Sequence, residues 1–131
     1  EYGQAIKKAK KVLELIPGNP VFVHQAQTTM GLAYVKKGER KKAIECLEAS
    51  WGDDFRGFVS AKNVDFELVE ALLKRGWGVP SCRAFLVKAR AFAEAAGEEP
   101  YVKLLDRMTG SFDVEFPAAK SASPSDEEVT R

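Results

Sequence analysis

The chain has 131 residues, of which 45% are hydrophobic and 30% are charged, a composition typical of one globular domain. Its 20 Lys and Arg residues nearly balance 19 Asp and Glu residues, and the net charge of +1 disfavours a strongly basic nucleic-acid-binding protein. The single histidine, His24, excludes a metal site built from several histidines. No metal and no cofactor is expected, because the sequence also lacks a Gly-rich phosphate-binding loop.

Two cysteines, Cys46 and Cys82, bear on the compartment in which the protein works. Their wide separation fits free thiols in a reducing compartment better than a disulfide scaffold. No run of about 18 apolar residues is present, so no transmembrane segment is expected. The chain begins at Glu1 without a signal-type apolar segment, which indicates a fragment or a processed form. The predicted localisation is cytoplasmic.

Apolar residues recur with helical spacing through the first 51 residues. In residues 2–16 they recur every three or four positions with lysines between them, which predicts an amphipathic helix. Asn19 is a suitable N-cap, so a second helix is predicted over residues 20–37, with Gly38 at its end. A third helix is predicted over residues 39–51. The very short link between the second and third helices requires them to pack antiparallel.

The following half of the chain contains weaker helix signals. Residues 55–62 fit either a loop or one or two additional helical turns. Asn63 or Asp65 can cap a fourth helix that ends at residue 75, and Ser81 is predicted to cap a fifth that ends near residue 96. A short sixth helix is predicted over residues 100–108, with Gly110 after it.

The last 21 residues differ in character from the rest. Residues 111–116 alternate apolar and polar side chains, which predicts an extended strand with Phe112, Val114 and Phe116 on one side. Residues 118–131 are small, polar and acidic and are expected to be disordered. The chain is therefore divided into a helical domain over 1–110 and a tail over 111–131. The tail either packs into a groove of its own or a neighbouring chain, or serves only as a linker.

A period of 38 residues relates the predicted helices to one another. Val35-Lys36-Lys37-Gly38 recurs as Leu73-Lys74-Arg75-Gly76. Three further series follow the same offset, namely Ala5, Ala43 and Ser81; Ile6, Ile44 and Cys82; and Ala9, Leu47 and Phe85. Small residues in the first series allow two antiparallel helices to approach closely. One helix hairpin cannot bury both of its faces, so the repeat predicts stacked hairpins.

This pattern resembles the tetratricopeptide-repeat (TPR) family, whose unit is a helix pair of 34 residues. The middle unit of the chain fits best, with Met30-Gly31-x-x-Tyr34 followed by Gly38, Ala43 and Leu47. The third unit has Leu68-Val69-x-x-Leu72 and lacks the Gly and Tyr of the family pattern. The longer period of this chain indicates longer helices or longer links between units.

The resemblance covers roughly residues 2–97 and implies an all-α fold. Antiparallel helix hairpins would stack as a right-handed TPR-like superhelix, with residues 100–108 as a capping helix and a flexible C-terminal tail. In such a stack the helix over residues 2–16 has no preceding partner helix. Further residues are therefore expected before Glu1 in the parent protein, or this helix contacts another chain. The N-terminal helix and the tail are accordingly the candidate surfaces for self-association.

The resemblance also implies a binding site, because the first helix of each TPR unit lines a concave, peptide-binding surface. Carried over residue by residue, this partner-binding groove would contain Gln25, Thr28, Thr29, Leu32, Val35 and Lys36 from the middle unit, and Asn63, Phe66, Glu67, Glu70, Leu73 and Lys74 from the third. The carboxylate clamp of some family members is not expected, since Thr28 and Leu32 occupy positions where it needs charge and amide. For each residue the alternative is that it packs or faces water.

These features favour a non-catalytic protein–protein interaction module or assembly scaffold that binds a peptide or a partner protein in the groove. The alternative is a helical regulatory domain that binds nucleic acid or an anionic surface through lysine-rich faces at residues 7–11 and 36–42. No exposed aromatic residues alternate with these lysines, so a solvated surface is the favoured interpretation and nucleic acid is the less favoured partner.

Overall fold

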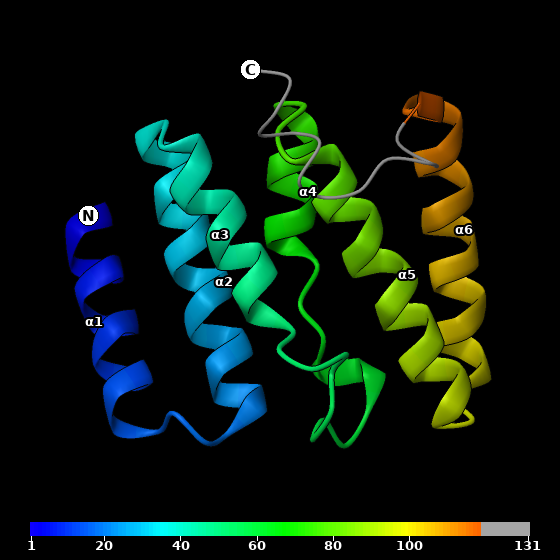
Figure 1. The fold of residues 1–131 in the computed structure, drawn as a ribbon, viewed down its shortest axis with the longest axis horizontal. Coiled ribbons are helices and arrows are strands. Elements are labelled where there is room, and N and C mark those ends of the chain that lie inside the picture. Colours follow the sequence, from blue (N-terminus) through cyan, green and yellow to red (C-terminus); the bar gives the residue numbers. More distant parts are fainter. Residues whose placement is uncertain (119–131) are drawn as a thin grey trace.

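A computed structural model describes residues 1–118, and its regular structure is entirely helical (Figure 1). The elements are α1 (Tyr2–Leu15), α2 (Pro20–Lys37), α3 (Arg40–Ser50), the 3-10 helix η1 (Ala61–Asn63), α4 (Glu67–Lys74), α5 (Val79–Ala95) and α6 (Glu99–Glu115). The absence of strands from the described residues confirms the all-α prediction. Residues 119–131, most of the segment predicted to be disordered, lie outside the part that the structure describes.

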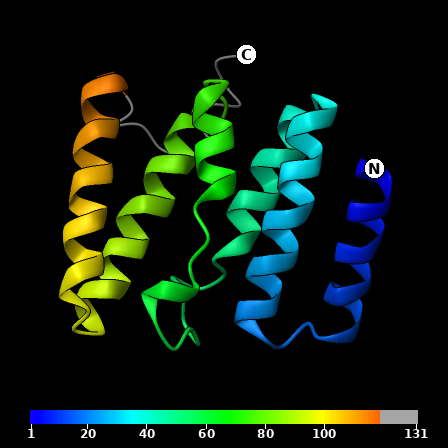
Figure 2. The ribbon, with the colours of Figure 1, turned by 180° about the vertical axis from the view of Figure 1, so that it is seen from behind.

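Successive helices pack against one another in antiparallel pairs (Figure 1). Helix α2 lies between α1 and α3, and α5 lies against α6. The two groups of helices are joined by contacts of α2 with α4 and of α3 with α5. Figure 1 shows α3 and α5 in front, and Figure 2 shows α2 and α4 from the opposite side. No helix of the described residues is long and apolar enough to cross a membrane.

The ends of α2 form as the sequence predicts. The Asn19 side chain accepts hydrogen bonds from the backbone N–H groups of Val21 and Phe22, both at 3.1 Å. These bonds satisfy two of the amide donors that have no partner within a helix. Gly38 ends the helix in the left-handed conformation with φ +77°, which costs glycine little because it has no Cβ.

The predicted cap of the fifth helix is wrong. Helix α5 begins at Val79, preceded by Gly78 as the N-cap with φ +59°. A Cβ at Gly78 would lie 2.8 Å from Ile44, so a glycine permits both the turn and the close approach of α3 and α5. Ser81 is buried inside the helix, where its Oγ donates a 2.7 Å hydrogen bond to the Glu48 carboxylate of α3. Its hydroxyl therefore links two helices instead of capping one.

The segment between α3 and α4 was ambiguous in sequence and consists of turns followed by η1. Two aromatic side chains of this segment pack into the core: Phe55 is 0% exposed and Phe58 is 7% exposed. Their rings meet edge to face at 5.2 Å between centroids, and both also contact the ring of His24. Helix α4 consequently begins only at Glu67, whose backbone N–H donates to the Asp65 carboxylate at 2.9 Å.

The predicted end of the sixth helix is also wrong, because α6 continues through Gly110 to Glu115. Phe112 is 3% exposed, Phe116 is half-buried beside it, and Val114 is 83% exposed, so the three do not share one side. Arg83 of α5 donates to the Asp113 carboxylate at 2.9 Å and holds this last turn in place. Met108, Phe112 and Phe116 are spaced by four residues and continue the apolar stripe of the helix. The extended arm predicted from residue 111 is thus part of the helical domain.

Gly31 lies where α2, α3 and α4 meet. A Cβ at this position would lie 2.5 and 3.0 Å from the two methyl groups of Leu68 and 3.1 Å from the Cβ of Cys46. Both neighbours are buried, and the Cβ of Cys46 is fixed directly to the α3 backbone. The missing side chain therefore permits α4 and α3 to reach α2 at the same level.

We expect Gly31→Ala to lower the free energy of unfolding by about 1–3 kcal/mol, because the overpacking exceeds the gain in helix propensity. The matched control is Gly110→Ala in α6, where a Cβ would meet nothing within 4 Å. It should raise the free energy of unfolding by about 0.5–1 kcal/mol. Urea denaturation followed by tryptophan fluorescence measures both, and equal effects would contradict this account of Gly31.

The extension of α6 is tested by a second pair of variants. Phe112→Ala removes a buried ring and should cost about 3 kcal/mol of stability. Val114→Ala removes an exposed side chain from the same turn and should change stability by less than about 0.5 kcal/mol. Thermal or urea unfolding compares the two, and similar losses would mean that residues 111–115 do not pack as a helix.

Candidate partner-binding surface

The residues predicted on α2 do not all reach the surface. Gln25, Thr29 and Lys36 are exposed and Leu32 is half-buried, and their spacing of three or four places them on one face. Thr28 and Val35 are each 4% exposed and belong to the core. They lie seven residues apart on the side of α2 that packs against its neighbours, so their assignment to a groove is wrong.

The predicted residues around α4 divide in a similar way. Glu67, Glu70 and Lys74 are exposed on α4, and Leu73 is half-buried beside them. Phe66 is half-buried and meets the ring of Phe85 edge to face at 5.9 Å, which makes it part of the aromatic core. Asn63 lies in η1, before α4 begins, and is half-buried. Only the residues within α4 itself form a continuous outer face.

The accessible residues of these two helices are here called the partner face. Helices α2 and α4 contact each other and lie side by side in the view of Figure 2. The partner face consists of Gln25, Thr29, Leu32, Lys36, Glu67, Glu70, Leu73 and Lys74. It mixes acidic, basic, amide, hydroxyl and apolar groups, a combination that suits recognition of a peptide more than of a single charged ligand.

A groove of about 390 Å³ borders the partner face between α4 and α6. Glu70 and Leu73 form its α4 wall, and buried Leu86 of α5 lies among its lining residues. The α6 wall contributes Leu104, Arg107, Met108, Ser111, Phe112 and Glu115. The sequence prediction treated residues 100–108 only as a capping helix and ended the helix there, so it missed the part of the wall formed by Ser111, Phe112 and Glu115. The signal was the helical spacing of Leu105, Met108 and Phe112, which competed with the strand-like alternation of residues 111–116.

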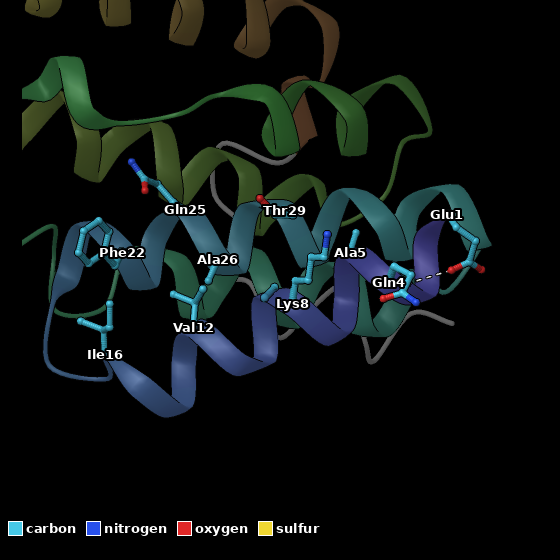
Figure 3. A pocket seen from close by; sticks show the side chains of 11 residues that line it. Glu1, Gln4, Ala5, Lys8, Val12, Ile16, Phe22, Gln25, Ala26 and Thr29 are labelled. Atoms are coloured by element: carbon cyan, nitrogen blue, oxygen red, sulfur yellow. Dashed lines mark hydrogen bonds between the residues drawn. The ribbon is translucent and has the colours of Figure 1, made fainter.

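A second groove of about 660 Å³ runs between α1 and α2 (Figure 3). Gln25 and Thr29 lie on its α2 side, so the predicted site residues are distributed over two grooves. Apolar side chains gather at one end, where Val12 and Ile16 of α1 lie near Phe22 of α2. The other end is polar and is lined by Glu1, Gln4 and Lys8.

The basic stretch at residues 36–42 is partly neutralised by its own neighbours. Glu39 pairs with Lys42 at 3.2 Å and with Lys37 at 3.4 Å. The hydrogen bond from Lys42 lowers the pKa of Glu39 and, reciprocally, raises the pKa of Lys42. The ammonium of Lys36 lies 6.0 Å from the Tyr2 ring centroid, which links the end of α2 to the start of α1.

His24 lies in the core and not beside the groove, with 0% of its surface exposed. The backbone N–H of Asp65 donates to its Nε2 at 2.8 Å, so this nitrogen carries no proton. Its Nδ1 lies 3.1 Å from the Ser50 carbonyl oxygen and, in this tautomer, donates to it. Burial lowers the pKa of His24, and the contacts with Ser50 and Asp65 offset this only in part. A neutral imidazole with both nitrogens occupied is a structural group.

The two cysteines are buried free thiols. Burial raises the pKa of Cys46 to about 11 and that of Cys82 to about 12. Neither thiol is therefore ionised near neutral pH, and a thiolate is the form that attacks substrates or binds metals. Both side chains pack as small apolar residues within the core.

Comparisons with protein-family models, with curated proteins and with solved structures each gave no match to this chain. Among residues 1–118, no group of three or more His, Cys, Asp or Glu side chains is arranged to hold a metal ion.

The state of His24 predicts how stability depends on pH. Its pKa is lowered in the folded protein relative to the ordinary 6.5, so the unfolded chain binds a proton first as the pH falls. The contribution of neutral His24 to the free energy of unfolding is complete above about pH 6.5. Below it, the free energy of unfolding should fall by about 1.4 kcal/mol per pH unit until the folded-state pKa is reached.

Urea denaturation between pH 7.5 and 5 measures this slope. The variant His24→Gln should be less stable than the original chain at pH 7.5 by about 2 kcal/mol, because one buried backbone group loses its partner. Its stability should then change much less over the same interval, since no imidazole titrates. If His24→Gln kept the full change of unfolding free energy with pH, other groups would be responsible for the pH dependence.

Proposed function

We propose that this chain is a non-catalytic protein-interaction module that binds a peptide or partner protein along the partner face. The main observation in support of this proposal is the lining of the α4–α6 groove. Apolar side chains of Leu73, Leu86 and Met108 line it, while Glu70, Arg107 and Ser111 add polar groups. Apolar pockets with a few polar groups take up side chains of a ligand and fix the course of its backbone.

The packing of the helices supports a TPR-like stack as the scaffold for this function. The pairs α2–α3 and α4–α5 would be two successive hairpins, joined by the contacts of α2 with α4 and of α3 with α5. The approach of Leu68 to Gly31 supplies a reason for glycine in the Met30-Gly31-x-x-Tyr34 pattern. In this arrangement the partner face and the wall of α6 belong to one continuous ligand-binding surface.

The states of the histidine and of the two cysteines support a binding role over a catalytic one. His24 is buried with both ring nitrogens occupied, and both thiols are held in their protonated form. Their positions in the core are those of structural side chains. We also propose a reducing, cytoplasmic setting, in which two buried free cysteines would stay unpaired.

The proposal is tested by selecting 16-residue peptides from a displayed random library against the whole chain. Affinities of the selected peptides are then measured for the variants Glu70→Lys and Glu45→Lys. Both variants change the net charge equally, but Glu70 lines the α4–α6 groove and Glu45 is exposed on α3. We expect Glu70→Lys alone to weaken binding, by about tenfold where the peptide carries a cation opposite it.

Salt dependence separates this function from attraction to an anionic surface. Binding of selected peptides should weaken only modestly between 50 and 200 mM salt, because apolar contacts contribute most of the affinity. A single-stranded oligonucleotide or an anionic vesicle that bound more tightly than any peptide, with steep salt dependence, would favour the lysine-rich faces instead. Equal losses of peptide affinity in Glu70→Lys and Glu45→Lys would likewise contradict binding at the partner face.

A further inference from the structure

The α1–α2 groove is formed by two helices that are rich in lysine and poor in acidic residues. Residues 1–37, which form both of its walls, contain six lysines and two glutamates and so carry a net charge of +4. The α2 wall, Pro20–Lys37, contains no acidic residue at all. Since the whole chain carries +1, residues 38–131 have a net charge of −3. The walls of the groove therefore belong to a segment with an excess of positive charge, and Glu1 and Lys8 are the charged side chains that line the groove itself.

The repeat in the sequence indicates what shape of ligand the groove accepts. Four α1 residues that line it are Ala5, Lys8, Ala9 and Val12. At the offset of 38 they correspond to Ala43, Cys46, Leu47 and Ser50 of α3, all of which are at most 5% exposed. Two of these α3 residues contact α2 directly, because the Cβ of Cys46 limits the space at Gly31 and the Ser50 backbone carbonyl accepts from His24. Helix α3 thus buries all four of these positions, whereas on α1 Ala9 is buried, Ala5 and Val12 are half-buried and Lys8 is exposed.

The same correspondence gives the position that a helix bound to α1 would occupy. Helix α2 packs against α3 and also contacts α4. By the 38-residue offset, α1 corresponds to α3 and α2 to α4, so an equivalent helix would pack against α1 and contact α2. That position is the groove of Figure 3, with half-exposed Phe22 and Ile16 at one end. A helix of about 14 residues would span α1, which itself has 14 residues.

One difference between the two positions determines the chemistry of the ligand. Cys46, which faces Gly31 across the α2–α3 contact, is replaced on α1 by Lys8. Lys8 is exposed and extends from α1 into the polar half of the groove (Figure 3). A carboxylate on the incoming helix would pair with this ammonium, whereas a copy of α2, which has no acidic residue, would leave it unpaired. A second copy of this chain that used its own residues 1–37 would bring a second segment of net charge +4.

We propose that the α1–α2 groove binds an amphipathic helix of a partner protein, with an apolar stripe and an acidic residue opposite Lys8. The apolar stripe packs on Val12, Ile16 and Phe22, and the carboxylate lies near Lys8. This inference rests on the proposed interaction role but concerns a surface separate from the α4–α6 groove. The two sites can therefore be tested independently.

The probe is a synthetic 20-residue peptide that copies residues 19–38 with Gly31→Glu. A covalent bridge between its positions 25 and 29 holds it helical, because these side chains are exposed in α2 and would face away from the groove floor. Two control peptides carry Gly31→Gln and Gly31→Lys. We expect the Glu peptide to bind three to five times more tightly than the Gln peptide, and the Lys peptide to bind most weakly.

Charge reversal on the protein provides the matched control. Lys8→Glu should invert the order of the three peptides, whereas Lys7→Glu should leave the order unchanged. Both residues are exposed on α1 and both variants alter the net charge equally, but only Lys8 lines the groove. Fluorescence anisotropy gives the affinities, and shifts of the α1 amide signals in NMR spectra locate the bound peptide.

Four results would overturn the proposal. They are failure of all three peptides to bind, equal effects of Lys7→Glu and Lys8→Glu, NMR shifts confined to α3 and α4 through displacement of α2, and self-association of the chain that excludes the peptide. A separate outcome is that the α1–α2 groove binds none of the three helical peptides while peptides selected for the partner face still lose affinity with Glu70→Lys. In that case the proposed function stands without the second site. If the Glu70→Lys test fails and the charge order holds, the α1–α2 groove is the binding surface of the protein.

Discussion

The arrangement of the helices depends on the neutral imidazole of His24. Its two nitrogens bridge the end of α3, through the Ser50 carbonyl, to the start of α4, through the Asp65 amide. Its ring is enclosed by Phe55, Phe58 and Phe85, which come from the connecting segment and from α5. One side chain thereby satisfies two buried backbone groups and organises the aromatic core. Protonation would place an N–H opposite the Asp65 amide, so the neutral form is a condition of the fold.

The second constraint is the close approach of helix backbones on either side of this core. Gly31 permits Leu68 and Cys46 to reach α2, and Gly78 permits Ile44 of α3 to reach the start of α5. The 38-residue repeat places Ala43 and Ser81 at equivalent positions of α3 and α5, and both are buried. Small residues at crossing points fix which helices meet and at what level. The course of the partner face across α2 and α4 follows from these contacts.

Most helices were predictable because their apolar spacing and caps agree, as in α2 between Asn19 and Gly38. The failures arose where tertiary contacts outweighed a local signal. Gly110 resembled a helix end, but the packing of Phe112 and the pair of Arg83 with Asp113 continue α6. Phe55 adopts φ +62° in a turn that no local preference predicts, since burial of its ring compensates the strain. Thr28 and Val35 were misplaced because family analogy assigns a face without resolving which residues the next helix covers.

The near-neutral net charge conceals two chemically different halves. Residues 1–37 carry a net charge of +4 and residues 38–131 carry −3, so the positive and negative side chains are unevenly distributed along the chain. The α4–α6 groove is lined by both Glu70 and Arg107 and can pair either charge on a ligand. The α1–α2 groove has Lys8 on its α1 wall and no acid on its α2 wall, so a cation placed opposite Lys8 is disfavoured, with Glu1 at the end of the groove as the one acidic residue among its described lining residues. The two proposed sites thus differ in the ligand charge that they favour, and they adjoin on α2, where Gln25 and Thr29 of the partner face also line the α1–α2 groove.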